Sequence, residues 1–336
     1  MRLSVIGAGS WGTTLAHLFC SNGHSVHLWA REPEVAEGIR ERHRNPFFVS
    51  GLELSPDIFV TCDLDECLKK TDGVVFAVPS NHLRRMACEL ASRVSSGTGI
   101  LNAAKGLEPE SGKRLSEVLL EVFGVAANSA ADRIAVLSGP NLATEIASGK
   151  IGATVVASPN EDWNQTLQEA LASRTFRVYR HSDRIGVELG GTLKNVFAIG
   201  AGIVDGLNLG DNAKAAYLTR CLHEMVRLGA RLGGKPATFY GLSGLGDLMA
   251  TAMSPLSRNH QMGLALARNR REEFQNESAR MVVEGVETAR MAREWGKKLT
   301  IPLPITEEIY SVLFENKSPR EAAKDLMTRS LKDEES

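Results

Sequence analysis

The chain has 336 residues, of which 43% are hydrophobic and 24% are charged, and its formal net charge is −1. This length allows two domains with cores of their own. The near-neutral charge excludes a general attraction to nucleic acid or to a membrane surface, so any site for an anion has to be local.

The spacing of the cysteines and histidines, and the length of the apolar runs, further restrict which class of protein this chain can belong to. The five cysteines form no C-x-x-C pair, which is typical of free thiols in a reducing compartment. The eight histidines show no metal-ligand spacing, and we predict no metal site. The first residues, MRLSVIGAGS, form a strand pattern rather than a signal peptide, and no run reaches the roughly 18 apolar residues of a membrane helix. These features predict a cytoplasmic protein that does not insert into a membrane.

Short apolar runs alternate with helical patterns in the first half of the chain. RLSVI (2–6) precedes a helical pattern over 10–21, and SVHLWA (25–30) is the next strand. Further strands are expected at 73–79, 99–105, 133–139, 152–158 and 174–180, with helices at 80–94 and 113–123. This alternation predicts an α/β fold of the Rossmann type, with a parallel-rich sheet covered on both faces.

The pattern becomes helical throughout near residue 182. Ser182 is expected to cap a long helix that includes the buried run VFAIGAGIV, and a second helix ends at the glycine pair 233–234. Further helical patterns cover 258–270, 284–296 and 304–315. We therefore expect a dinucleotide-type domain over residues 1–185 and an all-α domain over residues 186–336.

A glycine pattern follows the first strand. VIGAGSWG contains G-x-G-x-x-G at the start of a helix, the context in which this otherwise weak pattern is informative. Gly7 permits a tight turn, Gly9 lets the backbone approach a pyrophosphate, and Gly12 permits close packing of the helix. The helix N-terminus adds amides and the positive end of a dipole. An ordinary turn is the alternative, but the context favours a dinucleotide site.

The end of the second strand bears on the choice of dinucleotide. Arg31 can receive a 2′-phosphate, which favours NADP(H), whereas the adjacent acid Glu32 leaves NAD(H) possible. Arg31 could also be a solvated loop charge. We predict that NADP(H) is preferred and that NAD(H) can be used.

Ligands of such sheets bind beyond the carboxyl ends of the strands, where two polar groups stand out. Lys105 ends a strand and precedes a glycine, so it can face the ligand crevice or be a surface charge. Gly139 and Asn141 precede a helix whose amides could face an anion. A helix cap by Asn141 is the simpler alternative.

In the helical half, Lys194 lies within a predominantly apolar helix. Burial or a neighbouring cation would lower its pKa towards the range of a general acid or base. A lysine that extends to solvent fits the same pattern. The run GLSGLGDL (241–248) predicts a tight loop that presents Asp247, which could orient a lysine or a substrate hydroxyl, or cap a helix.

The run SPLSRNHQMG places a hydroxyl, a guanidinium and an amide in succession. Ser257, Arg258 and Asn259 together offer donors suited to an anionic ligand. A helix start with a solvated arginine would explain the same three residues. The residue types alone therefore leave an anion site as a hypothesis.

Seven stretches together resemble the bacterial NAD(P)-dependent sn-glycerol-3-phosphate dehydrogenases. They are VIGAGSWGTTLA, NAAKGLE, SGPNLATEIA, GGTLKNVFAIGAGIVDGLNLGDNAKAA, GLSGLGDLMAT, SPLSRNHQMG and VVEGVETA, which occur in family order up to about residue 290. The resemblance implies reduction of dihydroxyacetone phosphate to sn-glycerol 3-phosphate, and the reverse reaction, in the supply of phospholipid backbones. With the apolar helical region, it also implies a homodimer.

The resemblance implies roles for individual residues. Lys194 is expected to donate and accept the proton, with support from Lys105 and Asp247. The positions implied to contact the substrate are Lys105, Gly139, Asn141, Lys194, Asp247, Ser257, Arg258 and Asn259. The positions implied to contact the cofactor, besides the three glycines of the turn, are Ser10, Trp11, Arg31, Phe48, Lys105, Ala143, Arg258, Val282 and Glu284.

The chain departs from the family pattern at three positions. Asn141 stands where Ser or Thr is usual, and its amide can still donate a hydrogen bond. Phe48 stands where Tyr is frequent, so it can stack but offers no hydroxyl. Cys221 stands where Gly is common, which we interpret as a packing change.

Two rival functions stay open at this point. A different two-domain dehydrogenase, acting on a β-hydroxyacid or ketopantoate, would share the N-terminal glycine pattern. A non-catalytic NADP(H) sensor would bind the cofactor without a functional Lys194 or Arg258.

Overall fold

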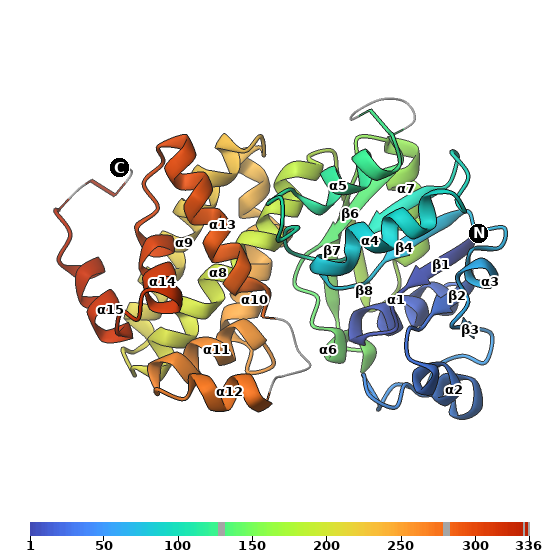
Figure 1. Ribbon diagram of the computed structural model, residues 1–336, viewed down its shortest axis with the longest axis horizontal. Helices are drawn as coiled ribbons and strands as arrows, with labels where there is room; N and C mark the ends of the chain where they lie inside the picture. The colour runs from blue at the N-terminus through green and yellow to red at the C-terminus, as the bar shows by residue number, and fades with distance from the viewer. Residues whose placement is uncertain (127–131, 278–282, 332, 335–336) are drawn as a thin grey trace.

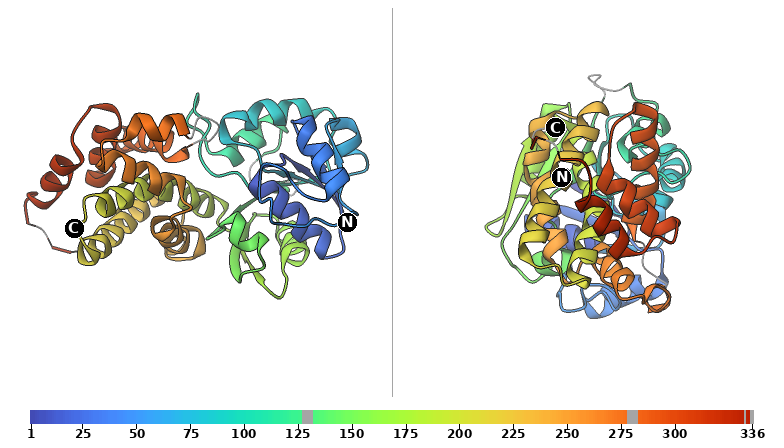
Figure 2. Two further views of the ribbon diagram at one scale, coloured as in Figure 1. Left: turned by 90° about the horizontal axis from the view of Figure 1, so that it is seen from below. Right: turned by 90° about the vertical axis from the view of Figure 1, so that its left-hand side faces the viewer.

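The computed structural model describes residues 1–126, 132–277, 283–331 and 333–334. An α/β part, formed by the first half of the chain, lies beside an all-helical part along the longest axis (Figures 1 and 2). Helix α8 (Arg184–Gly206) begins shortly after the last strand and leads into the helical part. The predicted fold class is confirmed.

The described residues form one eight-stranded sheet in the order β3-β2-β1-β4-β5-β6-β7-β8. All neighbouring strands are parallel except β6 and β7, which are antiparallel. The order reverses between β1 and β4, which places a ligand crevice beyond the carboxyl end of β1. The strands are β1 (Arg2–Ile6), β2 (Ser25–Trp29), β3 (Phe59–Thr61), β4 (Gly73–Phe76), β5 (Gly99–Asn102), β6 (Ile134–Ser138), β7 (Gly152–Ala157) and β8 (Phe176–His181).

Helices cover both faces of the sheet because successive strand residues point to opposite sides. Leu3 and Val5 of β1 pack into the core beneath α1 and α7, whereas Ile6 packs beneath α4 and α5. The helices of this part are α1 (Ser10–Ser21), α2 (Pro33–Arg42), α3 (Leu64–Leu68), α4 (Ser80–Ala91), α5 (Leu115–Val122), α6 (Ala143–Ala147) and α7 (Glu161–Leu171).

The helical part is built around α8, which is buried along nearly its whole length. Helix α8 is long and apolar enough to cross a membrane, but its apolar window is entirely inside the protein, as in a core helix. The elements around it are α9 (Asp211–Arg231), the 3-10 turn η1 (Pro236–Tyr240), the π-turn η2 (Leu242–Gly246), α10 (Asp247–Met253), α11 (Arg258–Ala267), α12 (Arg271–Glu277), α13 (Glu284–Leu299), α14 (Pro304–Phe314) and α15 (Pro319–Met327).

The start of α8 differs from the prediction by one residue. The cap is Asp183 rather than Ser182, and its Oδ1 accepts the N–H of Gly186 at 2.9 Å. The other oxygen of Asp183 accepts hydrogen bonds from the Lys235 N–H and the Thr238 hydroxyl, at 2.8 and 2.6 Å. A carboxylate has two oxygens, so it can cap the helix and bind the following turn together.

The run GLSGLGDL was expected to be a loop, and this expectation was wrong. It forms η2 and the first two residues of α10, Asp247 and Leu248. A Cβ at Gly244 would lie 2.0 Å from the Phe239 carbonyl oxygen, and one at Gly190 of α8 would lie 2.8 Å from that of Ser243. The glycines therefore allow backbones to touch, and the sequence pattern alone does not distinguish this use from a flexible turn.

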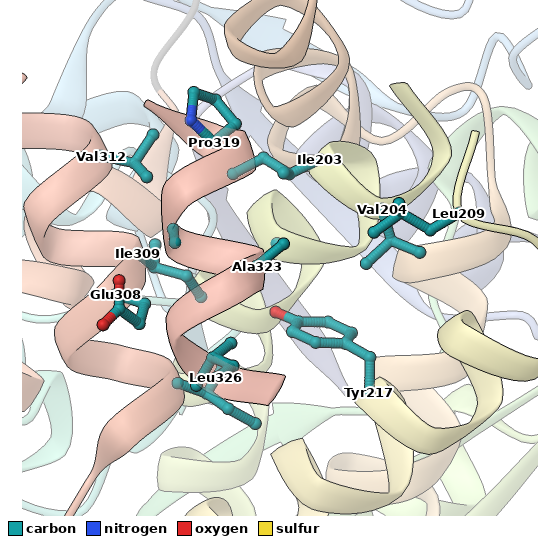
Figure 3. A pocket seen from close by; sticks show the side chains of 13 residues that line it. Ile203, Val204, Leu209, Tyr217, Glu308, Ile309, Val312, Pro319, Ala323 and Leu326 are labelled. Atoms are coloured by element: carbon teal, nitrogen blue, oxygen red, sulfur yellow. The ribbon is translucent and has the colours of Figure 1, made fainter. Parts of the chain in front are cut away.

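A small cavity of about 50 Å³ lies between α8, α9, α14 and α15 (Figure 3). Its lining is almost entirely apolar, with Tyr217 and Glu308 as the polar exceptions, and includes none of the predicted site residues. We interpret it as a packing gap beneath α15.

Glu224 of α9 is a buried carboxyl that takes the place of a cap for α14. It accepts the N–H groups of Ile305 and Thr306 at 2.6 and 3.1 Å, and the Thr306 hydroxyl at 2.9 Å. Burial raises the pKa of Glu224 to about 7, although these hydrogen bonds favour the charged form.

This shift predicts a pH-dependent stability. The folded pKa is about 7 and the ordinary value is 4.5, so the folded state holds the extra proton. This extra proton contributes about 3 kcal/mol to the free energy of unfolding. The contribution is complete below the ordinary pKa of 4.5 and is lost as the pH rises through the folded pKa of about 7. Urea unfolding measured from pH 5 to pH 8 should show a smaller fall in the free energy of unfolding for Glu224→Gln than for the wild type. Parallel plots of this free energy against pH for the two proteins would contradict the raised pKa.

Candidate active site

The glycine turn between β1 and α1 has the geometry of a dinucleotide site. Gly7 has φ +110°, and a Cβ at Gly12 would lie 1.8 Å from the Gly7 carbonyl oxygen. A Cβ at Gly9 would meet nothing within 4 Å, so open space lies outside the turn. No side chain caps α1, which begins at Ser10 and Trp11. The free helix end and the open space fit a pyrophosphate.

Two further cofactor candidates lie near this turn. Ala143 is the first residue of α6, and its carbonyl oxygen is 3.5 Å from the Thr14 hydroxyl of α1. Phe48 is partly buried and lies on the segment after α2. Val282 lies outside the described residues.

Arg31 lies just beyond the end of β2 and pairs with the neighbouring acid. Its Nε donates to Glu32 Oε1 at 2.8 Å, and Nη2 contacts the same oxygen. Both side chains are substantially exposed, at 67% and 41%. A phosphate approaching Arg31 would therefore meet a guanidinium that is already paired.

The centre of the site is a carboxylate between two lysines from different elements. Asp247, at the start of α10, lies 2.5 Å from Lys105 Nζ and 3.1 Å from Lys194 Nζ, each through a different oxygen. Lys105 follows β5, and Lys194 is in the middle of α8. The structure therefore joins the α/β and helical parts at this ion-pair cluster.

Thr251 and Gly139 complete the contacts of the two ammonium groups. Lys194 Nζ donates to the Thr251 hydroxyl at 2.7 Å, and that hydroxyl is 3.1 Å from Asp247 Oδ1. Lys105 Nζ donates to the Gly139 carbonyl oxygen at 2.9 Å. Thr251 was not predicted as a site residue, although its spacing of four from Asp247 places both on one face of a helix.

Burial governs the protonation of this cluster. Lys194 is only 7% exposed, and this burial lowers its pKa; Lys105 lowers it further, while Asp247 opposes both effects. Burial also acts to raise the pKa of Asp247, but the two lysines outweigh it and lower that pKa. Asp247 therefore stays ionised beside a lysine that releases its proton more readily than usual. Such a pair is suited to proton transfer.

Glu284 lies next to this cluster at the start of α13. Burial raises its pKa to about 7, against the opposing charges of Lys194, Lys105 and Arg258. Its Oε2 accepts a hydrogen bond from Asn195 Nδ2 at 3.2 Å. Asn195 was not predicted as a site residue, because adjacency to Lys194 in a helix does not indicate that both face one site.

The three residues Ser257, Arg258 and Asn259 have different surroundings. Ser257 caps α11 by accepting the His260 N–H, as the alternative interpretation expected. Asn259 accepts the Gly285 N–H at 3.0 Å and donates to Asn195 Oδ1 at 2.8 Å, so its amide joins α11 to α13 and α8. Arg258 has no hydrogen-bond or ion-pair partner within the described ranges. Of the three, it is the cation available to an anionic ligand.

Polar atoms near Lys105 also lack partners. Asn141 does not cap α6; its Nδ2 donates to the Thr154 hydroxyl at 2.9 Å. Asn141 Oδ1 and Ser138 Oγ are buried, with no hydrogen-bond partner among the residues that the structure describes. Unpaired buried polar atoms are uncommon, and here they fit a polar ligand beside Lys105.

This chain combines a parallel-rich sheet, which carries an uncapped glycine turn, with a helical part that supplies a buried lysine. Such a combination is typical of the class of two-domain NAD(P)-dependent dehydrogenases. The comparisons with known proteins identify the family. Models of the NAD-dependent glycerol-3-phosphate dehydrogenase N-terminus and C-terminus match residues 2–164 and 183–324. The chain belongs to this family, which confirms the resemblance found in the sequence.

Full-length relatives agree with this assignment. The chain is 45% identical to glycerol-3-phosphate dehydrogenase [NAD(P)+] of Syntrophotalea carbinolica, over 99% of each chain. It is also 45% identical to the Moorella thermoacetica enzyme of the same name, over 97% of this chain and 96% of that one. The relatives' names include both cofactors, and both fit the site.

Solved structures separate the family from a rival. The crystal structure of glycerol-3-phosphate dehydrogenase from Coxiella burnetii aligns with a TM-score of 0.90 at 35% identity, covering 98% of this chain and 99% of that one. A ketopantoate reductase family protein from Ralstonia eutropha aligns with a TM-score of 0.59 at 14% identity, over 97% and 100% of the two chains. The second likeness extends to the fold alone.

Proposed function

We propose that this protein reduces dihydroxyacetone phosphate to sn-glycerol 3-phosphate with NAD(P)H, and catalyses the reverse reaction. The observation that carries the proposal is the buried Lys194–Asp247–Lys105 cluster at the junction of a dinucleotide-type sheet and the helical part. Membership of the glycerol-3-phosphate dehydrogenase family supports the choice of substrate.

Each residue of the cluster has a separate task in this reaction. The nicotinamide supplies the hydride to the carbonyl carbon when the cofactor is bound at the glycine turn. Lys194 donates a proton to the carbonyl oxygen as negative charge develops there. Asp247 holds the Lys194 ammonium, and Lys105 adds positive charge near the same oxygen. In the reverse direction, Lys194 accepts the proton.

Arg258 and its neighbours bind the phosphate in this proposal. The Arg258 guanidinium, which has no hydrogen-bond partner among the described residues, supplies charge-assisted hydrogen bonds, and Ser257 fixes its position at the first turn of α11. Gly139, Asn141 and Asn259 line the rest of the substrate site. Phosphate binding far from the carbonyl holds the reacting carbon in place, so it contributes to turnover as well as to affinity.

We further propose that the cofactor is held by the glycine turn with Ser10 and Trp11, by Arg31, and by six further residues that the family resemblance implies. NADP(H) is preferred because Arg31 can receive a 2′-phosphate, and NAD(H) is also used because Glu32 competes with that phosphate for Arg31. The further residues in this proposal are Phe48, Lys105, Ala143, Arg258 and Glu284, together with Val282, which lies outside the described residues.

Replacing Glu32 tests this account of cofactor choice. Glu32→Gln should raise the NADPH-to-NADH ratio of kcat/KM up to about 5-fold, since an exposed ion pair contributes up to about 1 kcal/mol. Steady-state rates with each cofactor measure the ratio. Glu34→Gln, an exposed change one residue into α2, is the matched control. An unchanged ratio in Glu32→Gln would contradict the role of this pair.

We propose also that the chain divides into its two domains near residue 185, that it acts in the cytoplasm in glycerophospholipid supply, and that it forms a homodimer.

Exposed apolar side chains support the homodimer: Met249 and Met253 lie on one face of α10, followed by Leu256. Light scattering after size exclusion tests it, with twice the mass of the chain expected. The mass of a single chain at micromolar concentration would overturn it.

The reaction itself is tested by product analysis. Dihydroxyacetone phosphate, ketopantoate and a β-ketoacid are each incubated with the protein and NADPH or NADH, and the products are identified by mass spectrometry. We expect glycerol 3-phosphate from the first substrate alone. Turnover of ketopantoate or the β-ketoacid would favour the rival dehydrogenases, and NADPH binding without any turnover would favour a sensor.

A further inference from the structure

A single buried amide ties the segment after α2 to the glycine turn. Asn45 is 1% exposed, and its Nδ2 donates to the Ala8 carbonyl oxygen at 2.8 Å and to the Thr13 hydroxyl at 2.9 Å. Ala8 lies between the first two glycines of the turn, and Thr13 is in the first turns of α1. Asn45 therefore holds the outside of the proposed cofactor turn.

The other end of the same amide fixes the backbone of Phe48. Asn45 Oδ1 accepts the N–H groups of Phe47 and Phe48, both at 3.1 Å. These bonds use both donors and both acceptor positions of the amide. Phe47 points to solvent, with 60% exposure, whereas Phe48 is partly buried. One side chain thus sets the position of Phe48 relative to the glycine turn.

The residue after Phe48 has a strained backbone. Val49 has φ +45°, a region that β-branched residues rarely adopt. Among the described residues, the other β-branched residue with positive φ is Thr300, which ends a helix. Val49 instead lies inside a connecting segment, where its carbonyl oxygen accepts the Leu52 N–H at 2.8 Å. Strain of this kind persists where surrounding contacts enforce it, often at ligand clamps.

We propose that Asn45 is a positioning residue for the cofactor, holding Phe48 so that its ring packs against NAD(P)H bound at the turn. The inference rests on the proposed function, because it requires a dinucleotide at this turn. Asn45 itself has no free hydrogen-bonding group for the ligand and acts through Phe48. The strain at Val49 is maintained by the same segment and keeps the ring in place before the cofactor arrives.

Direct binding separates this role from a purely structural one. NADPH is titrated into Asn45→Ala, Val49→Gly and the wild type without substrate, and tryptophan fluorescence reports binding. Asn45→Ala should raise the Kd about 10-fold while kcat at saturating cofactor and KM for dihydroxyacetone phosphate stay within about twofold. Val49→Gly should raise the Kd about threefold, because glycine relieves the strain and frees the segment.

Asn164→Ala is the matched control, since Asn164 is buried in the same part of the protein and donates to the His181 carbonyl oxygen away from the turn. It should lower Tm and leave the Kd unchanged. The inference is overturned if Asn45→Ala binds NADPH as tightly as the wild type does. It is also overturned if Val49→Gly leaves the Kd unchanged. Val49→Gly alone provides the test should Asn45→Ala not fold. A wild type that binds neither NADPH nor NADH would instead overturn the proposed function.

Discussion

Lys194→Met should lower kcat by about 10³-fold while the Kd for NADPH changes less than about twofold. General acid catalysis contributes 10²- to 10⁴-fold, and methionine fills the space of the lysine stem but has no ammonium group to donate a proton. Asp247 retains its contact with Lys105, so the variant should fold. Steady-state kinetics with dihydroxyacetone phosphate and fluorescence titration with NADPH give the two quantities.

Two further variants define what Lys194 contributes. Lys194→Arg keeps a positive charge but does not release a proton near neutral pH, so its kcat should also stay low. Lys297→Met, an exposed change on α13, should have wild-type kinetics. If Lys194→Met retained a near-normal kcat, the proton would have to come from another group.

Asp247→Asn should lower kcat/KM for dihydroxyacetone phosphate by about 10²-fold and shift its pH dependence. Asp247 opposes the lowering of the Lys194 pKa by burial, so its removal lowers that pKa further. Reduction requires the protonated lysine. The pH above which the rate falls should therefore be lower in the variant than in the wild type.

Rate measurements from pH 6 to 10 test this shift. Asp211→Asn is the control, because Asp211 also begins a helix but is exposed. An unshifted fall in rate for Asp247→Asn would contradict the coupling between Asp247 and Lys194. Unfolding measurements on the same variant should show a loss of stability, since removing the carboxylate leaves two partly or fully buried ammonium groups unpaired.

The sequence predicted a helix or strand correctly wherever a local residue pattern is enough to determine it. Seven of the eight strands were expected, because buried parallel strands are near-continuous apolar runs. The missed strand, β3, has only the three residues Phe59–Thr61, too few to show a periodic pattern in the sequence. At GLSGLGDL, glycines that serve close packing were interpreted as a loop.

The site was predictable residue by residue but not as an arrangement. Lys105, Lys194 and Asp247 were candidates on chemical grounds or by resemblance, yet the contact of Lys105 with Asp247 spans 142 residues. A contact between residues so far apart in the chain leaves no periodic pattern in the sequence. Asn45 and Asn195 were missed for the same reason, since an asparagine in a loop or helix gives no sign of what its amide binds.

The most direct test of the central claim is the initial rate of NADPH oxidation at 340 nm, with dihydroxyacetone phosphate and with phosphate-free dihydroxyacetone, in the wild type and in Arg258→Leu. The account predicts rapid oxidation that depends on the phosphate ester in the wild type. At saturating NADPH, it predicts a loss of at least about 10²-fold in kcat/KM for the phosphate ester in Arg258→Leu, with little change for dihydroxyacetone. Equal wild-type rates with both compounds, or no oxidation by folded protein that binds NADPH, would contradict it.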